Sequence, residues 1–382
     1  MAFLNGITLF ASTVVDPPTG LWEWFILTVF SFIADYGWRI VLFTLALKIV
    51  LSPLDIFQRY KGRKNQKISE RLAPQIEKLQ KQYPDPQEFS RKQMELQRKE
   101  GFSYFSSCLP AIATMVIFIT LLIGMNKVSA YYNYTEYRDL YDTYHAAYTE
   151  YDAMSEEEKN QLKADEIISD KYKKDDETVW DDKTQYAQYK VSLRYEEIKK
   201  SFLWVKNIWS PDVPWKKEIN DQNTFQNNLG DYYKNPEKMG LTSNEVQTMV
   251  TEYNTVMGRL LDTSYNGANG YLVLPVLSVG LSFLMQWLTM RQQKKSGQVN
   301  DAMGGGSTMK MMMFMMPVLM GIFSLSYTAC FSLYLVVNYL VSLAINLSSS
   351  LLFVLIDKRD AKKAAETVHK YGRPDPNDTE TK

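Results

Sequence analysis

The sequence is poor in cysteine and histidine, each of which occurs only twice among 382 residues. Cys108 and Cys330 lie in apolar stretches, while His145 and His369 lie far apart in polar ones. Two isolated thiols do not build a disulfide framework, and no Cys/His cluster has the spacing of a zinc site. The composition therefore gives little support to a metal centre or to catalysis by cysteine or histidine.

Charged residues are absent or rare in five apolar stretches, each near the ~20 residues that an α-helix needs to cross a bilayer. These stretches are residues 37–57, 105–127, 271–290, 311–330 and 333–356. They predict an all-α polytopic membrane protein with five transmembrane helices, the fourth and fifth within 311–356. The balanced net charge conceals a segregation, because the intervening segments are dense in Lys, Glu and Asp.

An aromatic segment, "LWEWFILTVFSFIADYGW" (21–38), precedes the first span. We interpret it as an interfacial amphipathic helix that ends the N-terminal extracellular segment 1–36. Such a helix would hold three tryptophans at the level of the lipid headgroups, namely Trp22, Trp24 and Trp38. The alternative is a sixth, tilted span.

The segments between the spans differ in charge. Residues 58–104 hold 12 Lys/Arg and 6 Asp/Glu, the loop 291–310 holds 4 and 1, and the tail 357–382 holds 7 and 6. Residues 128–270 hold 17 and 26. Basic loops favour the cytoplasmic side of a membrane. We therefore predict that 128–270 is extracellular, that the N-terminus is outside and that the C-terminus is cytoplasmic.

Residues 58–104 are predicted to form a cytoplasmic helical hairpin. "YPDP" (83–86) is a strong turn signal, Gly101 is a candidate C-cap, and Pro74 marks a kink or restart in the first arm. Apart from one narrow apolar stripe the hairpin is charged throughout. It is either a solvated connection between two spans or a basic surface that contacts lipid headgroups, a nascent chain or the ribosome.

The extracellular segment 128–270 contains six tyrosines at heptad spacing: Tyr134, Tyr137, Tyr141, Tyr144, Tyr148 and Tyr151. This spacing predicts a helix that rises from the second span and packs through a tyrosine seam. We predict a further helix at 184–205, with core positions Tyr189, Leu193, Ile198 and Phe202, and a third at 243–262. "SPDVPW" (210–215) and "GANG" (267–270) predict breaks. The segment is thus an enlarged helical domain.

A full charge interrupts the first span. Lys48 stands within "LFTLALKIVLSPL" (42–54), on one helix stripe with Thr44, Ser52 and Asp55. Polar stripes recur in the third and fifth spans, at Ser278, Ser282, Gln286 and Thr289, and at Asn338, Ser342, Asn346 and Ser349. Small polar stripes alone usually indicate helix packing. A lysine near mid-membrane, with no Asp or Glu in the other spans to pair with it, instead predicts a hydrated cavity that attracts an anion.

Several segments resemble the YidC-type membrane protein insertases, in the five-span bacterial form of the YidC/Oxa/Alb superfamily. "KIVLSPL" places a basic residue five positions before a Pro-Leu pair, as that family does. Further similar segments follow in the family's order: "SSCLPAIATMVIF" (106–118), "FLWVKNIWSPD" (202–212), "YLVLPVLSVGLSFLMQWL" (271–288) and "MKMMMFMMPVLMGIFSLSYTACFSLYLVVNYLVS" (309–342). Several features depart from the family. It usually has arginine where Lys48 stands, Gln and Pro where Thr114 and Val116 stand, and proline where Thr328 stands. Insertions at about 129–200 and 216–268 enlarge a loop that is normally short.

The resemblance implies an insertase and chaperone that guides nascent membrane proteins into the lipid bilayer of the bacterial cell membrane. It implies no enzymatic activity, no catalytic residue, no metal and no cofactor. The substrate groove would be formed by Lys48, Thr44, Ser52, Gln286, Ser282, Asn338 and Ser342, and an apolar slide by Tyr334, Met312 and Met316. Lys48 would attract the acidic outer tail of a client. The Sec translocon and the ribosome are candidate partners, and no sequence-specific binding of nucleic acid is implied.

Two other classes of protein stay open. A channel or transporter would use the same polar cavity, but it should carry acidic coupling residues or repeats with broken helices. The sequence shows neither. An envelope sensor that works through the extracellular domain is favoured only by the size of that domain. Replacing residues 129–268 by a short linker distinguishes an insertase from a sensor: an insertase keeps its activity, and a sensor loses it.

Overall fold

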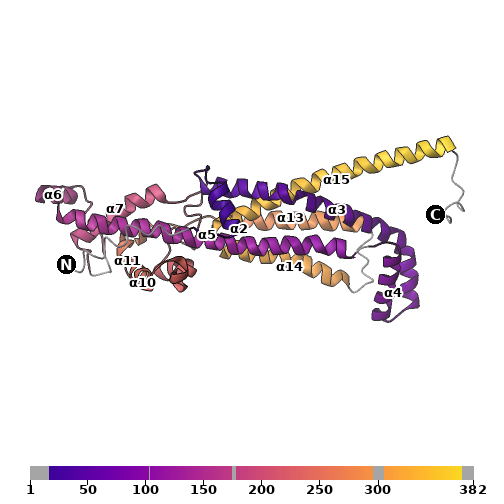
Figure 1. Cartoon of the computed structure of the whole chain (residues 1–382), viewed down its shortest axis with the longest axis horizontal. Coiled ribbons are helices and arrows are strands. Elements are labelled where there is room, and N and C mark those ends of the chain that lie inside the picture. The colour runs from indigo at the N-terminus through magenta and orange to yellow at the C-terminus, as the bar shows by residue number, and fades with distance from the viewer. Residues whose placement is uncertain (1–16, 103, 174–177, 296–304, 372–382) are drawn as a thin grey trace. The chain divides into compact units, whose positions relative to one another are not determined.

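The computed structural model describes residues 17–102, 104–173, 178–295 and 305–371. Within those ranges the chain forms helices and no β-strand, which confirms the predicted all-α class (Figure 1). The first part of the predicted extracellular segment, residues 1–16, lies outside the described residues.

The apolar stretches lie in α3 (Tyr36–Gln82), α5 (Tyr104–Asp152), α13 (Val273–Lys295), α14 (Gly305–Ser326) and α15 (Ala329–Tyr371). Among the described residues, four helices are long and apolar enough to cross a membrane: Tyr36–Gln82, Ile112–Asp152, Val273–Arg291 and Ala329–Ile356. The described apolar part of α14 is shorter, Pro317–Ser326. The chain is therefore a polytopic membrane protein, while the count of five spans stays a prediction.

The chain forms two compact units. The first unit comprises Met1–Thr44, Ala113–Phe283 and Met311–Val337, and the second comprises Leu45–Ile112, Leu284–Lys310 and Asn338–Lys382. The predicted cytoplasmic hairpin belongs to the second unit. The outer domain, by which we mean residues 128–270, belongs entirely to the first.

The hairpin of the second unit forms as predicted, with one difference. Its arms are the end of α3 and α4 (Pro86–Lys99), with Asp85 as N-cap and Gly101 at a φ of 77° after the C-terminus. The first arm does not restart at Pro74, because α3 runs through it to Gln82. A proline inside a helix removes a backbone hydrogen bond and bends the helix, and it need not end it. Buried apolar side chains from both arms hold them together, namely Ile68, Leu72 and Phe89.

The N-terminal aromatic segment of the first unit is helical over fewer residues than predicted. α2 (Leu21–Trp24) and η2 (Phe25–Val29) together end nine positions before the predicted limit of 38. Glu23 is buried and pairs with Lys127 of α5 at 3.8 Å. The indole N–H of Trp22 donates to Thr120 of α5 at 3.0 Å. This short helix therefore packs against α5, and it is too short to be a sixth span.

The outer domain is helical as predicted, but its helices are shorter and more numerous. They are the second half of α5, α6 (Glu156–Ala164), α7 (Asp182–Ile198), α8 (Gln222–Asn228), α9 (Asp231–Lys234), η3 (Pro236–Met239), α10 (Ser243–Thr251), α11 (Tyr253–Val256) and α12 (Gly258–Leu261). The predicted helix at 243–262 is thus three short helices, and α7 ends before 205. Both predicted breaks lie outside helices.

The tyrosine seam of α5 packs into the core of the outer domain, as its spacing predicted. Its members are buried except Tyr148, which is partly buried. Tyr137 is typical: its ring lies 4.7 Å from that of Phe225 and 5.0 Å from that of Tyr253. Its hydroxyl donates to the carbonyl of Met249 at 2.8 Å. The seam therefore joins the helix that leaves the membrane to the last helices of the domain.

α7 presents a different face to this core than the one predicted. Leu193 is 47% exposed, whereas Ala187 and Val191 are fully buried. Gln188 is also buried, because its amide donates to the carbonyl of Thr255 at 2.8 Å. A face that contains a buried glutamine and an alanine does not stand out as apolar in the sequence. The predicted core position Leu193 was therefore wrong, whereas Tyr189 is half-buried and Ile198 packs against the core.

A buried carboxyl group should make the stability of the outer domain depend on pH. The Oε1 atom of Glu136 on α5 is buried. Burial raises the pKa of Glu136 to about 8, although the charge of Lys200 and the nearby indole N–H of Trp209 oppose the shift. The folded domain therefore holds this proton more tightly than the unfolded chain, and its stability should fall as the pH rises from about 4.5 towards 8.

Glu136→Gln should remove this fall, because an amide has no proton to lose in that range. Thermal unfolding of the full chain in nanodiscs, followed from about pH 5 to pH 9, measures it. The matched control is Glu157→Gln, which removes an exposed carboxyl group of α6. Equal pH slopes for the parent and Glu136→Gln would contradict the prediction.

Candidate functional site

Lys48 lies in the second unit and has an acidic partner on its own helix. Its Nζ atom is 3.6 Å from Oδ2 of Asp55, seven positions further along α3. Their side chains are only 13% and 17% exposed. The expectation of an unpaired cation is therefore wrong: the other spans lack an acid, but two helical turns bring Asp55 within reach of the long lysine side chain.

The ion pair with Asp55 leaves Lys48 able to bind another anion. A separation of 3.6 Å exceeds the usual length of a hydrogen bond from an ammonium to a carboxylate. Asp55 thus compensates the charge of Lys48 without binding its N–H donors tightly. An anion that reaches Lys48 can compete with Asp55 for it.

Four other predicted groove residues share the second unit with Lys48. Ser52 donates its hydroxyl to the carbonyl of Ile49 at 2.8 Å. Gln286, Asn338 and Ser342 are half-buried. On α15, two further residues of the predicted stripe, Asn346 and Ser349, are buried. The second unit therefore carries amide and hydroxyl groups on α13 and α15 besides the ion pair of α3.

The remaining groove residues, Thr44 and Ser282, belong to the first unit and are buried. The Thr44 hydroxyl donates to the carbonyl of Ile40 at 2.7 Å, one turn back along α3. Its hydrogen is thus used inside the helix, which is the usual state of a threonine in an apolar helix. Thr44 can still accept a hydrogen bond, but it cannot donate another.

A buried serine relay in the first unit was missed by sequence reasoning. The hydroxyl of Ser278 on α13 lies 3.1 Å from that of Ser324 on α14, which lies 2.8 Å from that of Ser332 on α15. Ser332 also donates to the carbonyl of Ser324 at 3.0 Å. Hydroxyl groups that bond across helices stabilise helix association in apolar surroundings. Single serines in "IFSLSYTACFS" carry no spacing that would have revealed the relay.

The predicted apolar slide is only partly described. Tyr334 is 5% exposed and its ring lies 6.2 Å from that of Phe331, so it belongs to the interior of the first unit. This position differs from the apolar surface predicted for it. The side chains of Met312 and Met316 lie outside the described residues. α14 does present an exposed apolar surface, formed by Phe314, Met315, Val318, Leu319, Ile322 and Leu325.

The helices of the described part of the chain offer groups suited to binding. Among the described residues, no group of three or more His, Cys, Asp or Glu is placed to hold a metal ion. Cys330 is fully enclosed and therefore out of reach of a substrate. What the helices offer is a compensated charge, amides, hydroxyls and an apolar surface.

Comparisons with known proteins relate the chain to one family of membrane proteins. The model of the family described as 60Kd inner membrane protein matches residues 28–351. A membrane protein insertase YidC of Wolinella succinogenes is 35% identical over 94 residues, which are 24% of this chain and 17% of that protein. The insertase YidC of Helicobacter pylori (strain 26695) is 32% identical over 94 residues, 24% and 16% of the two chains. That of Clostridium tetani is 36% identical over 95 residues, 25% and 41%. The matched segments thus cover less than half the length of each of these relatives.

Proposed function

The chain belongs to the 60Kd inner membrane protein family, and from this membership we propose that it is an insertase that places nascent membrane proteins into the cell membrane. The family match over residues 28–351 carries the proposal. Insertion requires no covalent chemistry, because its barrier is the transfer of polar backbone and charged groups through hydrocarbon. A protein that shields those groups lowers the barrier.

Lys48 is proposed as the receptor for the acidic outer tail of a client. Its counter-ion Asp55 keeps the charge tolerable while no client is bound, and the tail then replaces Asp55 as the partner of the ammonium. Gln286 and Asn338, in the same unit, can exchange hydrogen bonds with the polar backbone of the tail. Thr44 and Ser282 are buried, and we assign them to helix packing beside the groove.

The exposed apolar surface of α14 is proposed as the path by which the client's apolar segment enters lipid. Met315 and Leu319 are flexible side chains within it, and Phe314 adds a large ring. Such side chains adapt to partners of different shape. This assignment replaces Tyr334, which is buried.

We propose that the N-terminus and the outer domain are extracellular and that the hairpin and the tail are cytoplasmic. The support is the asymmetry of basic residues, 12 of which lie in residues 58–104. A basic hairpin on that side suits contact with a ribosome, and an apolar exit suits cooperation with the Sec translocon. Both stay candidate partners.

Proteoliposomes that contain the purified full chain test the proposal. The client is a single-span protein with a short acidic N-terminal tail, synthesised in their presence, and protection of the tail from added protease measures insertion. Protection should rise with the amount of the chain in the liposomes. Protection no greater than in empty liposomes would refute the insertase, and ion flux without insertion would favour a channel.

Asp55→Asn should strengthen the capture of acidic clients. The substitution removes the carboxylate that competes with the tail, so the local net charge rises from zero to +1. Photo-crosslinking from a benzoylphenylalanine in the client tail should increase for an acidic tail and stay unchanged for a neutral tail. Weaker crosslinking of the acidic tail would show that Asp55 assists capture, contrary to the prediction.

A further inference from the structure

The loop between α7 and α8 differs in charge from the rest of the outer domain. We call residues 199–217 the basic loop: it holds five lysines and one acidic residue, Asp212. The remainder of the outer domain holds 12 Lys/Arg and 25 Asp/Glu. A concentration of one sign of charge in one loop of an acidic domain indicates an anionic partner for that loop.

Backbone contacts place the basic loop at the ends of three apolar helices of the first unit. The amide of Ala329, which starts α15, donates to the carbonyl of Ser210 at 3.0 Å. The amides of Tyr271 and Leu274, at the start of α13, donate to Asp212 at 2.8 and 2.7 Å. At the start of α3, the ring of Trp38 lies 5.8 Å from that of Phe202. In a membrane, the loop therefore lies where these helices leave the bilayer.

Lys200 of the basic loop is half-buried over the ring of Tyr36, and two exposed lysines of the loop have no acidic partner. Lys199 and Lys206 pair with the buried Glu218 at 3.5 and 3.4 Å. Lys216 and Lys217 are exposed and take part in no ion pair within the described part of the chain. The carboxylate of Asp212 is already occupied by backbone amides. Two free cations thus remain at the depth of the lipid headgroups.

Large apolar side chains accompany these cations. Trp215 is 62% exposed, immediately before Lys216 and Lys217. Leu203 is 69% exposed at the tip of a turn in which Phe202 and Val205 exchange two backbone hydrogen bonds of 2.9 Å. Leu203 has a φ of 53°, which leucine rarely adopts. Exposed tryptophan next to lysine is the composition typical of a segment at the membrane interface.

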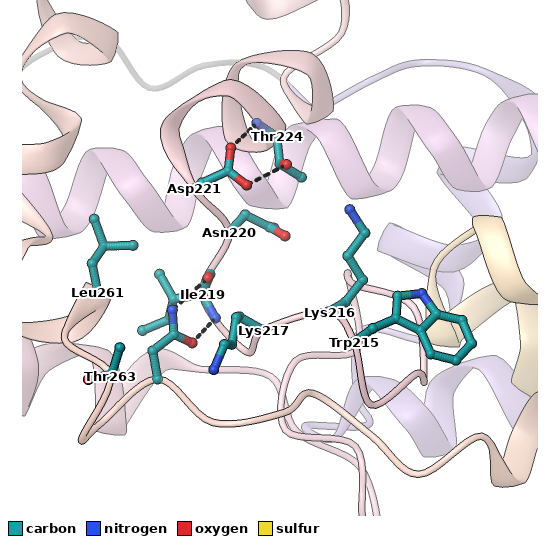
Figure 2. A pocket seen from close by; sticks show the side chains of 10 residues that line it. Trp215, Lys216, Lys217, Ile219, Asn220, Asp221, Thr224, Leu261 and Thr263 are labelled. Carbon is teal, nitrogen blue, oxygen red and sulfur yellow. Dashed lines mark hydrogen bonds between the residues drawn. The ribbon is translucent and has the colours of Figure 1, made fainter.

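A pocket adjoins the same three residues. It has a volume of about 280 Å³ and is lined by ten residues: Trp215, Lys216, Lys217, Ile219, Asn220, Asp221, Thr224, Leu261, Thr263 and Asn266. Figure 2 shows Trp215 and Lys216 at one end of it and Leu261 and Thr263 at the other. A phosphate group that contacts these lysines could keep its lipid chains beside Trp215.

We propose that the basic loop docks on the outer leaflet, with Lys216 and Lys217 on the phosphates of anionic phospholipids and Trp215 at the level of the headgroups. The loop would then hold the base of the outer domain against the membrane. The proposal does not depend on insertase activity, because it rests on the contacts of the loop with the apolar helices and on its unpaired charges.

Quenching by brominated lipids in nanodiscs tests the proposal on the full chain. One set of nanodiscs contains brominated phosphatidylglycerol in unbrominated phosphatidylcholine, and the other contains brominated phosphatidylcholine at the same level. Because the chain has 8 tryptophans, the contribution of Trp215 is the difference between the parent and Trp215→Phe. We expect Trp215 to be quenched in both sets and more strongly by phosphatidylglycerol.

Lys216→Gln/Lys217→Gln should abolish that preference, because each lysine near an anionic membrane surface strengthens binding to it about fivefold. The matched control Lys159→Gln/Lys163→Gln removes the same charge from α6, beyond the far end of α5, and should keep the preference. The proposal is overturned if Trp215 is quenched in neither set, because the basic loop would then not contact lipid. An acidic polypeptide would become the candidate partner of the loop. The proposal is also overturned if the lysine variant keeps the preference, or if inorganic phosphate alone eliminates it, as a site for soluble anions would require.

Discussion

Insertion of a client with an acidic outer tail should be nearly abolished by Lys48→Glu and retained by Lys48→Arg. The ion pair with Asp55 makes the local charge easy to follow: it is zero in the parent and in the arginine variant, −1 in Lys48→Ala and −2 in Lys48→Glu. At a separation of about 6 Å and an effective dielectric constant of about 20, each unit of charge changes the interaction with the tail by about 3 kcal/mol. That corresponds to a loss on the order of a hundredfold per unit.

A double variant separates a receptor from a structural lysine. Lys48→Ala/Asp55→Asn restores the local charge to zero without restoring the cation. If Lys48 only compensates Asp55, this variant should insert clients as well as the parent does. If Lys48 binds the tail, it should remain defective with acidic tails and be normal with neutral ones.

Initial insertion rates in proteoliposomes with equal amounts of each variant provide the measurement. Each variant is paired with one client whose tail is either acidic or neutralised by Asp→Asn exchange. The receptor role is excluded if Lys48→Glu inserts both clients at the parental rate. It is also excluded if the losses are independent of the charge of the tail.

Tyr253→Ala should destabilise the outer domain by about 3–5 kcal/mol, the range for removal of a buried large side chain. Tyr253 is 2% exposed, and its ring stacks on Phe225 at 4.4 Å and lies 5.0 Å from Tyr137. Its hydroxyl donates to the carbonyl of Asn220 at 2.8 Å. The substitution therefore leaves a cavity and a carbonyl without its donor.

Hydrogen exchange of the full chain in nanodiscs reports this loss region by region. Protection should fall in α10, α11 and the second half of α5 and stay unchanged in α13. Leu193→Ala, on the exposed face of α7, is the control and should change stability by less than about 0.5 kcal/mol. Equal effects of the two substitutions would mean that α11 does not close the core.

The parts of the fold that follow from repeated spacing were predictable. Six tyrosines at heptad positions determined both the extent of α5 and its buried face. α6 was missed, although Ser155 and Glu158 form a capping box, which is a local signal for the start of a helix. The face of α7 could not be found from hydrophobicity, because Gln185 and Gln188 are buried through hydrogen bonds to backbone groups far along the chain or in a neighbouring loop.

The residues of the candidate site stay a prediction, and the sequence did not reveal their contacts. Asp55 was placed on the stripe of Lys48, but an apolar run gives no indication that a side chain will turn along the helix to meet an acid two turns away. Tyr334 was assigned to an apolar wall from its place among apolar residues, and packing against Phe331 puts it in the interior. Burial of this kind depends on which helices meet, and that information is not local in sequence.

The hydrogen bond from Tyr137 to Met249 spans 112 positions of the chain. This separation determines when the core of the outer domain can form during synthesis. In the topology proposed above, α5 is synthesised long before α10, so its tyrosine face stays unmatched until the intervening segment and α10 to α12 have followed it across the membrane. Closing a loop of that length is slow compared with forming a helix. In that topology the core of the outer domain is completed only after α12 has crossed.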